Sequence, residues 1–426
     1  MKTDIVIVGT GVSGLYCALN LGQDKNIILV TKKAADESDS FLAQGGICVL
    51  KNKEDYDSYF EDTMRAGHYE NNKKSVEIMI NSSREVIKSL VGYGVRFRKD
   101  GEDFAYTKEG GHSTPRILFH EDITGKEITS HLLHAVQKLP NVKIIEHFTM
   151  TDIMESEGEC YGITGHDIDG NFTQIYADYT VLATGGIGGL FKHSTNYRHL
   201  TGDSLAVSLN HKIKLKTIDY IQIHPTTLYS TKKGRRFLIS ESVRGEGAVL
   251  LNKNGERFVN ELLPRDVVTK AIYEEMEKDD MPYVRLSFAP IETEQIKNHF
   301  PNIYKHCLEE GYDVTKECIP VVPSQHYFMG GIDVDMYSKT SMNRLYAVGE
   351  TACNGVHGKN RLASNSLLES LVFAKRAAAQ IEENYTKSAP PWDFALDIKQ
   401  YDNYEEKYKE AILAEIEKEK SKHESN

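Results

Sequence analysis

The chain has 426 residues, 40% of them hydrophobic and 27% charged, which is an ordinary globular composition with room for two or three domains. A formal net charge of −11 argues against nucleic acid and anionic membrane surfaces as partners. No apolar stretch reaches the roughly 18 to 20 residues that a membrane-spanning helix needs.

The six cysteines form no Cys-x-x-Cys pair and have no metal-ligand spacing with histidine. We therefore expect reduced thiols, no metal site and a cytoplasmic location. The N-terminus superficially resembles a signal peptide, but Asp4 interrupts its apolar run and its glycines serve another purpose.

The first 32 residues predict a strand, a glycine turn, a helix and a second strand. "DIVIVG" and "NIILVTK" are β-branched runs typical of buried parallel strands, and "GVSGLYCALNLG" has apolar residues at helical spacing. Gly9, Gly11 and Gly14 form a Gly-x-Gly-x-x-Gly fingerprint that allows a tight turn, close approach of a pyrophosphate and close packing of helix on strand. This predicts a dinucleotide-binding unit with the pyrophosphate at the helix N-terminus.

One residue usual in such a unit is missing. An acid normally ends the second strand and binds a ribose hydroxyl, but Thr31, Lys32 and Lys33 stand there. The nearest acids, Asp36 and Glu37, lie in the following loop. A simple NAD dehydrogenase is therefore less favoured.

Two further strand-plus-glycine segments, "YTVLATGG" (179–186) and "RLYAVGE" (344–350), lie far downstream. We expect them in one sheet with the first strand, so that both ends of the chain build an α/β, Rossmann-like domain. Residues from about 219 to 325 differ in texture, with several prolines, polar loops and an amphipathic helix near 267–278. We interpret this segment as an inserted α+β capping domain.

The expected division of the chain is 1–218 and 328–387 for the dinucleotide-binding domain, 219–327 for the capping domain and 388–426 for a short tail. "SAPPW", which begins at Ser388, marks the last boundary. The densely charged sequence after it predicts a solvated helix with a frayed end.

Glu109 lies in the loop "YTKEGGHSTPR" (106–116), which has neither a helical nor a strand period. By itself this loop is typical of an exposed turn. The alternative is that Glu109 faces a positively charged ligand, and the choice depends on what the rest of the chain binds.

Four downstream loops concentrate histidine and arginine, namely His224, Arg265, His326, and His357 with Arg361. Singly, each has a plain explanation: core histidines, Arg265 paired with Asp266, or Arg361 paired with Glu369. Together they indicate a small dianionic ligand, because arginine binds carboxylates bidentately and histidine can donate to carboxylate oxygens.

Eight segments carry a specific resemblance, in order and with matching spacing over residues 1 to about 385: "DSFLAQGGI", "KEGGHS", "VLATGG", "HPTTLY", "SESVRGEGAVL", "LPRDVV", "HYFMGGI" and "GKNRLASNSLLES". They resemble the flavoprotein family of succinate dehydrogenase, fumarate reductase and L-aspartate oxidase. This resemblance implies FAD as cofactor.

Matched position by position, the resemblance implies FAD contacts at Gly9, Thr10, Gly11, Val12, Ser13, Gly14, Lys32, Asp39, Ser40, Phe41, Leu42, Ala43, Gln44, Gly45, Gly46, Asp203, Glu350, Ser366 and Leu367. Lys32 thus replaces the missing acid. The Gly-Asp-Gly expected at 202–204 reads Gly-Asp-Ser, which keeps Asp203.

For the substrate, the resemblance implies carboxylate binding by His224, His326 and Arg361, with Ser240 where threonine is usual. It implies Gln222 as a further pocket residue and Arg265 as the proton-transferring residue.

Two positions distinguish branches of the family. Asp39 stands where succinate and fumarate enzymes typically carry a histidine bonded covalently to FAD, so FAD is expected to bind non-covalently. Glu109 stands where those enzymes have an apolar residue, and members that oxidise aspartate have Glu. The resemblance therefore implies FAD-dependent oxidation of L-aspartate to iminoaspartate, with fumarate or dioxygen as acceptor, in de novo NAD biosynthesis through quinolinate.

Two other functions stay open at this point. One is a soluble fumarate reductase or succinate-oxidising subunit, and the other is a flavin-binding redox sensor or scaffold, for which a dianion site has no use. The resemblance also suggests a functional coupling to a quinolinate synthase, which would take up the product. Longer members of the family continue into a helical domain of roughly a hundred residues. In this sequence only about forty residues follow the expected flavin domain.

Overall fold

The computed structural model describes residues 1–389, 394–395 and 397–424. The predicted boundary at "SAPPW" lies largely outside the described residues. Among those residues, no helix is both long and apolar enough to cross a membrane.

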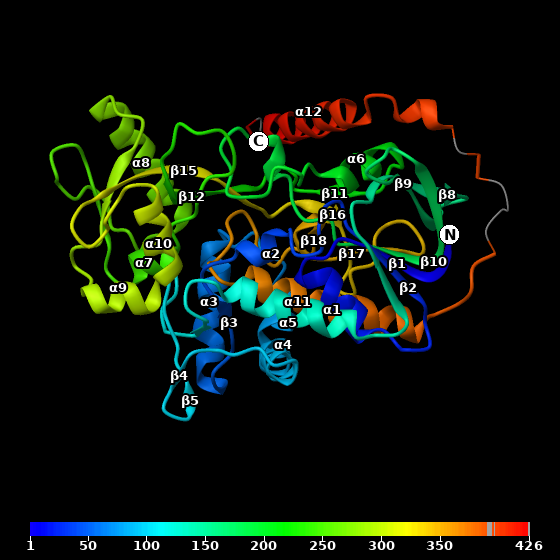
Figure 1. Ribbon diagram of the computed structural model, residues 1–426, viewed down its shortest axis with the longest axis horizontal. Coiled ribbons are helices and arrows are strands. Elements are labelled where there is room, and N and C mark those ends of the chain that lie inside the picture. The colour runs from blue at the N-terminus through cyan, green and yellow to red at the C-terminus, as the bar shows by residue number, and fades with distance from the viewer. Residues whose placement is uncertain (390–393, 396, 425–426) are drawn as a thin grey trace.

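The main sheet draws its strands from both ends of the chain (Figure 1). Its order is β7 (Val142–Ile145), β2 (Ile27–Val30), β1 (Lys2–Val8), β10 (Phe172–Leu182), β9 (Glu159–His166) and β8 (Thr149–Ser156). β17 (Leu345–Ala347) pairs in parallel with the last residues of β10, whereas β9 pairs antiparallel with its first residues. The predicted sheet containing the first, middle and late strands is confirmed.

Both faces of this sheet are covered, which explains the nearly continuous apolar strands. Side chains alternate along β1: Ile5 and Ile7 enter one core with α1 (Val12–Asn20) and α11 (Ser366–Glu383). Val6 and Val8 enter a second core on the opposite face. α5 (Thr124–Gln137) contacts α1, and α4 (Lys73–Gly92) contacts α11.

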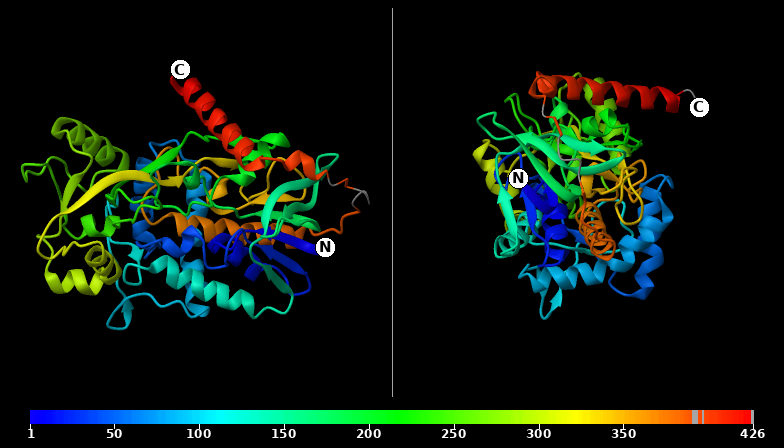
Figure 2. Two further views of the ribbon diagram at one scale, coloured as in Figure 1. Left: turned by 45° about the horizontal axis from the view of Figure 1, so that its top comes forward. Right: turned by 90° about the vertical axis from the view of Figure 1, so that its right-hand side faces the viewer.

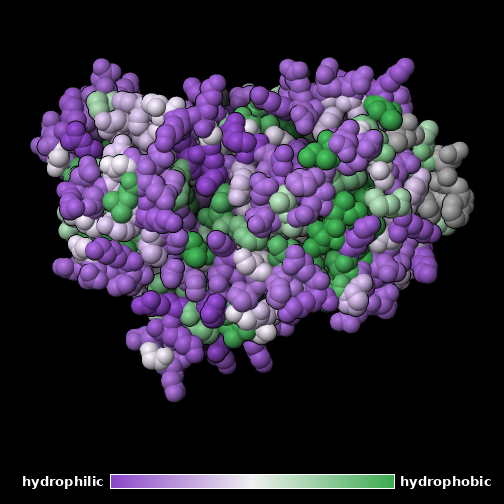
Figure 3. Space-filling model, in the orientation of Figure 1, coloured by the Kyte–Doolittle hydropathy of each residue, from purple (hydrophilic) through white to green (hydrophobic). Residues whose placement is uncertain are grey.

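A second sheet lies at the left of Figure 1. Its strands, in order, are β12 (Ile221–Leu228), β15 (Ile319–Phe328), β14 (Val284–Ser287) and β13 (Val249–Leu251). Its helices are α7 (Glu241–Gly245), α8 (Arg265–Asp279), α9 (Thr293–His299) and α10 (Pro301–Glu309). This capping part has a core of its own and a mostly hydrophilic surface on the face seen in Figure 3.

The remaining elements lie outside these two sheets and the helices named above. The strands are β3 (Ile47–Cys48), β4 (Lys99–Asp100), β5 (Asp103–Phe104), β6 (Ile117–Leu118), β11 (Leu215–Lys216), β16 (Gly331–Asp333) and β18 (Ala352–Cys353). The α-helices are α2 (Asp39–Leu42), α3 (Tyr56–Ala66), α6 (Asp203–Asn210) and α12 (Tyr404–Glu424). Four short 3-10 helices are η1 (Lys53–Asp55), η2 (Gly188–Leu190), η3 (Gly349–Thr351) and η4 (Ile398–Tyr401).

The predicted helical tail is present as α12, but the prediction that this helix is simply solvated is wrong for one of its faces. Tyr404, Tyr408, Ile412 and Ile416 recur every four residues and are buried in the second core. The Tyr408 hydroxyl donates to the backbone carbonyl of Thr151 at 2.7 Å. α12 lies across the top of the molecule in Figure 1, and Figure 2 shows its C-terminal part projecting beyond the body. Dense charge on the exposed positions hid this apolar stripe.

Candidate functional site: a flavin and dicarboxylate cavity

One large cavity runs from the end of β1 to the capping part and encloses about 1620 Å³ of empty space, partly open to solvent. Of the residues predicted to bind FAD, all but Gly14 and Phe41 line it. Of those predicted to contact substrate, all but Gln222 line it. The structure therefore gathers nearly the whole predicted site into one space.

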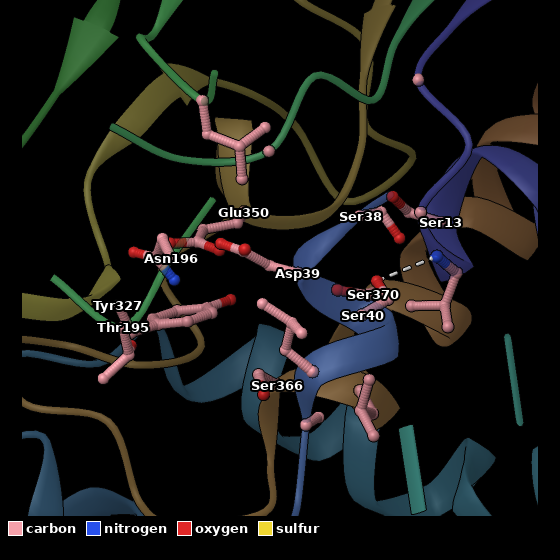
Figure 4. Close-up of a pocket in the computed structure, with 18 of the residues that line it drawn as sticks. Ser13, Ser38, Asp39, Ser40, Thr195, Asn196, Tyr327, Glu350, Ser366 and Ser370 are labelled. Atoms are coloured by element: carbon pink, nitrogen blue, oxygen red, sulfur yellow. Dashed lines mark hydrogen bonds between the residues drawn. The ribbon is translucent and has the colours of Figure 1, made fainter. Parts of the chain in front are cut away.

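The glycine turn after β1 leaves room at one end of the cavity. Gly9 has a φ of +116°, and a Cβ there would lie 2.1 Å from the carbonyl oxygen of Ala183. A Cβ on Gly14 would lie 2.0 Å from the Gly9 carbonyl oxygen, so Gly14 serves close packing of α1 on β1. The start of α1 faces the cavity, with the Val12 N–H meeting the Ser40 hydroxyl at 3.1 Å (Figure 4). A helix start of this kind suits a pyrophosphate.

Lys32 and Asp203 meet beside the same end. Lys32 Nζ lies 2.9 Å from an Asp203 carboxylate oxygen and 3.1 Å from the Thr201 hydroxyl. Lys32 stands where an acid usually ends β2, but it pairs with Asp203 of α6. An acid is therefore still present at this end of the cavity. Asp203 is an oxygen acceptor of the kind that binds a ribose hydroxyl.

Asp39 and Glu350 point toward one another in the middle of the cavity (Figure 4). Burial raises the pKa of Asp39 to about 7, although the Tyr197 backbone N–H donates to it at 2.9 Å. Burial and the nearby Asp39 raise the pKa of Glu350 to about 8. Asp39 carries no imidazole, so it offers no nitrogen for a covalent flavin link.

Several buried polar atoms of the cavity have no hydrogen-bond partner within the described part of the chain: Ser38 Oγ, Asp39 Oδ2, Gln44 Oε1, His224 Nε2 and Arg361 Nε. Buried polar groups are almost always paired in folded proteins. The donors and acceptors along this cavity, together with the glycine turn, fit a dinucleotide at one end and an anionic substrate at the other. The residues present therefore fit FAD.

Arg265 begins α8 and is held from two sides. Its Nε donates to Glu241 at 2.5 Å, and one Nη donates to the Gln222 amide oxygen at 2.8 Å. Burial alone would raise the pKa of Glu241, but Arg265 and the neighbouring Arg244 keep that pKa below its ordinary value. Arg265 is thus paired with Glu241, and the sequence neighbour Asp266 instead contacts His68 at 3.0 Å.

His224 and His326 face each other edge to face, with ring centroids 5.1 Å apart. Burial and the charge of Arg265 hold the pKa of both imidazoles well below the ordinary value, so both are neutral. The His224 Nδ1 lies within hydrogen-bonding distance of both the Thr226 carbonyl oxygen, at 3.1 Å, and the Thr226 N–H, at 3.2 Å, and its Nε2 has no partner among the described residues. A neutral imidazole carries one N–H, which can donate to a carboxylate when it lies on the unpaired nitrogen.

Arg361 is 4% exposed and lies over the Tyr327 ring at 4.3 Å. Burial lowers the pKa of Arg361 to about 10, which leaves the guanidinium charged at neutral pH. The alternative pairing with Glu369 is not formed: that carboxylate accepts from Asn354 and Ser370. His357, in the same loop, lies outside the cavity lining and contacts Tyr327 at 3.5 Å.

Glu109 is not exposed: it is 2% accessible and lines the substrate end of the cavity. Ser242 and Ser364 donate to its two oxygens at 2.5 and 2.6 Å. Burial raises the pKa of Glu109, and the neighbouring Glu241 raises it further. The interpretation of this loop as an exposed turn is therefore wrong.

Sequence reasoning missed three functional residues. One is Glu241, which follows Ser240 directly and pairs with Arg265. A buried arginine needs a carboxylate partner, but the sequence offers several acids and does not show which one it is. Tyr327 follows His326 directly, and Ser364 lies three residues after Arg361. The prediction of loops is wrong for the two histidine segments, because His224 lies in β12 and His326 in β15. Gln222, predicted to contact substrate, instead supports Arg265 and donates to the Arg361 carbonyl at 2.8 Å.

Comparison with known proteins agrees with this geometry. Residues 4–367 match the FAD binding domain family. The chain is 55% identical over 379 residues to an L-aspartate oxidase of Clostridium perfringens, covering 89% of this chain and 86% of the relative. It is 50% identical over 386 residues to an L-aspartate oxidase of Clostridium acetobutylicum, covering 90% and 89%.

Among solved structures, an E. coli quinol fumarate reductase superposes with a TM-score of 0.85 at 28% identity, covering 98% of this chain and 74% of that one. The flavin cavity is thus carried on a fold shared with fumarate reductase. The chain belongs to the FAD-binding flavoprotein family and has L-aspartate oxidases among its relatives.

Proposed function

We propose that this protein oxidises L-aspartate to iminoaspartate with bound FAD as the immediate electron acceptor. The observation that carries the proposal is Glu109, an acid buried at the end of the cavity that Arg265, Arg361 and two neutral histidines also line. The other acid at this end, Glu241, is already paired with Arg265, whereas Glu109 has only hydroxyl donors among the described residues. A carboxylate can pair with the ammonium group of aspartate, whereas a dicarboxylate without an amine offers it no partner.

The charges suggest how the substrate is oriented. Arg361 has no carboxylate partner among the described residues, so it is available to one substrate carboxylate. His224 and His326 offer N–H donors to a substrate carboxylate, and Glu109 faces the ammonium. These four residues come from four separate segments of the chain, and together they would hold Cα in a single orientation.

Oxidation at Cα removes a hydrogen with its electron pair, which FAD accepts when bound. Formation of the C=N bond also requires loss of one N–H proton, and we assign its acceptance to Glu109. Arg265, paired with Glu241, is assigned the role of proton donor to carbon when fumarate is reduced. Fumarate or dioxygen is proposed to reoxidise the flavin.

The fumarate reductase likeness favours a second candidate, reduction of fumarate or oxidation of succinate without oxidation of aspartate. Glu109 argues against it, because a buried negative charge repels a dianion.

The proposed product, iminoaspartate, is an imine that water hydrolyses, which supports its direct use by a quinolinate synthase in NAD biosynthesis. Six free cysteines support the reducing cytoplasm as the proposed location.

The test is anaerobic mixing of the purified yellow protein with L-aspartate, D-aspartate or succinate while the flavin absorbance is followed. Bleaching by L-aspartate, and not by its enantiomer, is expected. Bleaching by succinate alone would support the fumarate reductase candidate and overturn the proposal.

A further inference from the structure

The Glu109 carboxylate joins two parts of the fold through two serine hydroxyls. Ser242, in α7 of the capping part, donates to one carboxylate oxygen at 2.5 Å. Ser364, just before α11 of the main domain, donates to the other at 2.6 Å. Ser364 also accepts the N–H of Gly46, in the flavin segment, at 3.1 Å. Each oxygen of Glu109 is thus fixed by a different part of the chain.

The loop that carries Glu109 packs closely against two other segments. A Cβ on Gly45 would lie 2.6 Å from an oxygen of Glu109, and a Cβ on Gly110 would lie 2.4 Å from an oxygen of Glu241. On the other side of the loop, a Cβ on Gly245 would lie 2.4 Å from the Lys108 carbonyl oxygen. The loop carrying Glu109 is therefore packed tightly between the flavin segment and α7.

The direction of the Ser242 hydrogen bond is fixed by its neighbour. The Ser240 hydroxyl donates to the Ser242 hydroxyl at 3.2 Å, and the Ser242 N–H donates back to the Ser240 oxygen at 3.3 Å. Because the Ser242 oxygen already accepts a proton, its own proton is left to donate to Glu109. The chain of donors runs from Ser240 through Ser242 to Glu109.

An ammonium site at this position needs an ionised carboxylate, and the surroundings work against one. Glu109 is buried beside a second carboxylate, Glu241, and both effects favour the neutral acid. Hydroxyl donors favour the ionised form. Each carboxylate oxygen also keeps a second lone pair for an incoming N–H.

We infer that Ser242 is a specificity-determining positioning residue: by donating to Glu109 from the capping part, it keeps that carboxylate ionised and aimed at the substrate ammonium. The inference rests on the proposed oxidation of L-aspartate and deepens it. It also makes amine recognition depend on the capping part being closed over the main domain, since α7 supplies the donor.

The test compares Ser242→Ala with the wild-type holoenzyme, using two ligands that differ only in the amine. The half-saturating L-aspartate concentration is taken from the rate of anaerobic flavin bleaching, and the Kd of succinate from its perturbation of the flavin spectrum. Losing a hydrogen bond to a charged group predicts a rise of about ten- to hundredfold for L-aspartate. The Kd of succinate is expected to stay within about threefold.

A pH series separates positioning from a merely structural role. Removing one donor raises the pKa of Glu109, so the weakening of L-aspartate binding at low pH is expected to begin at a higher pH in Ser242→Ala. Ser242→Thr, which keeps the hydroxyl, is expected to restore the wild-type profile. Ser287→Ala, at a buried capping serine outside the cavity, is the matched control.

The outcomes distinguish the two proposals. If L-aspartate fails to bleach the wild-type flavin, the proposed function falls. If it bleaches the wild type but Ser242→Ala changes neither ligand, or both equally, only the role of Ser242 is overturned. Should Ser242→Ala lose FAD, Ser242→Cys keeps the side-chain size with a weaker donor, and the same selective loss for L-aspartate is required of it.

Discussion

Asp39 and Glu350 direct their carboxyl groups at one another across the flavin cavity, from α2 and η3 respectively (Figure 4). Among the residues that the structure describes, neither group has a cation as a hydrogen-bonding partner: Asp39 accepts from the Tyr197 N–H and Glu350 from the Phe328 N–H. Two facing acids in a buried space favour sharing of protons over double ionisation. This relationship has a measurable consequence for stability.

Asp39 and Glu350 are expected to contribute stability to the flavin-free protein that is lost as pH rises from about 5 to about 8. The folded pKa values of Asp39 and Glu350, about 7 and about 8, exceed the ordinary values of about 4. These two groups therefore hold more protons in the folded state than in the unfolded state in this window, and their contribution to the free energy of unfolding falls with increasing pH. Because the buried neutral histidines, such as His224 and His326, act in the opposite sense below about pH 6.5, the measurement is the difference in thermal unfolding midpoint between Asp39→Asn and the wild type. Asp39→Asn is expected to gain relative to the wild type as pH rises from about 5 to about 8, and a difference that stays constant with pH would contradict the prediction.

FAD is expected to leave the protein when it is denatured in acid and to stay in the supernatant after precipitation. Asp39 cannot form the covalent bond that an imidazole forms at this position. Absorbance of supernatant and pellet near 450 nm decides the matter, since yellow colour in the pellet would mean that another residue is linked to the flavin.

Arg265→Leu is expected to abolish fumarate reduction while FAD stays bound, because Arg265 lies at the substrate end of the cavity. Losing a proton-transfer group costs about a hundredfold to ten-thousandfold in rate. Removing one partner of a buried ion pair also destabilises the fold by about 3 to 5 kcal/mol, so flavin content and unfolding are measured in parallel.

Arg285→Leu, at an exposed arginine of β14, is the matched control. A variant of Arg265 that loses flavin, or one that keeps its activity, would remove this residue from the chemistry.

Glu109→Gln is expected to reduce aspartate oxidation far more than fumarate reduction. The substitution keeps the shape but removes the charge proposed to meet the ammonium, at about 2 to 5 kcal/mol for a desolvated pair, or about thirtyfold to several thousandfold. Fumarate has no amine and gains from loss of a negative charge.

The ratio of the two activities is the measurement, and Glu102→Gln, at an exposed acid nearby, is the control. A ratio that stays within about threefold of the wild type would assign Glu109 a purely structural role.

Ile412→Ala is expected to lower the free energy of unfolding by about 2 to 5 kcal/mol, since it leaves a cavity under α12. Ile412 is 1% exposed, and its side chain ends 3.1 Å from where a Cβ on Gly202 would lie, next to the flavin-site residue Asp203. Urea unfolding measures the loss. Lys409→Ala, on the exposed side of the same helix, is expected to change it by less than about 0.5 kcal/mol. Equal effects of the two changes would mean that α12 contributes little.

The glycine turn and the three strands β1, β10 and β17 of the main sheet could be predicted, because both depend on local sequence patterns. Gly9, Gly11 and Gly14 act within one βαβ unit, and a short apolar run predicts a buried strand at any position in the chain. The tail was misjudged for a related reason. The density of charge in the tail is evident from its composition alone. The apolar stripe from Tyr404 to Ile416 becomes visible only when residues four apart are placed on one face of a helix.

The contacts of the substrate end could not be predicted in the same way. Glu241 and Ser242 act on Arg265 and Glu109, and a contact between α7 and the Glu109 loop joins segments about 130 residues apart. Position-by-position matching assigned Gln222 to the pocket but gave no direction for its amide. In the structure that amide lies behind Arg265.

The order of strands in the main sheet also dictates how the chain can fold while it is being synthesised. β10 ends at Leu182, and its partner β17 begins at Leu345, about 160 residues later. At roughly 5 to 20 residues per second of translation, the edge of β10 stays unpaired for on the order of ten seconds. The intervening segment, with a core of its own, can fold first on the ribosome. Until β17 is made, Thr180, Val181 and Leu182 of β10 form a strand edge without its partner, and an unpaired strand edge is a template for pairing with another chain.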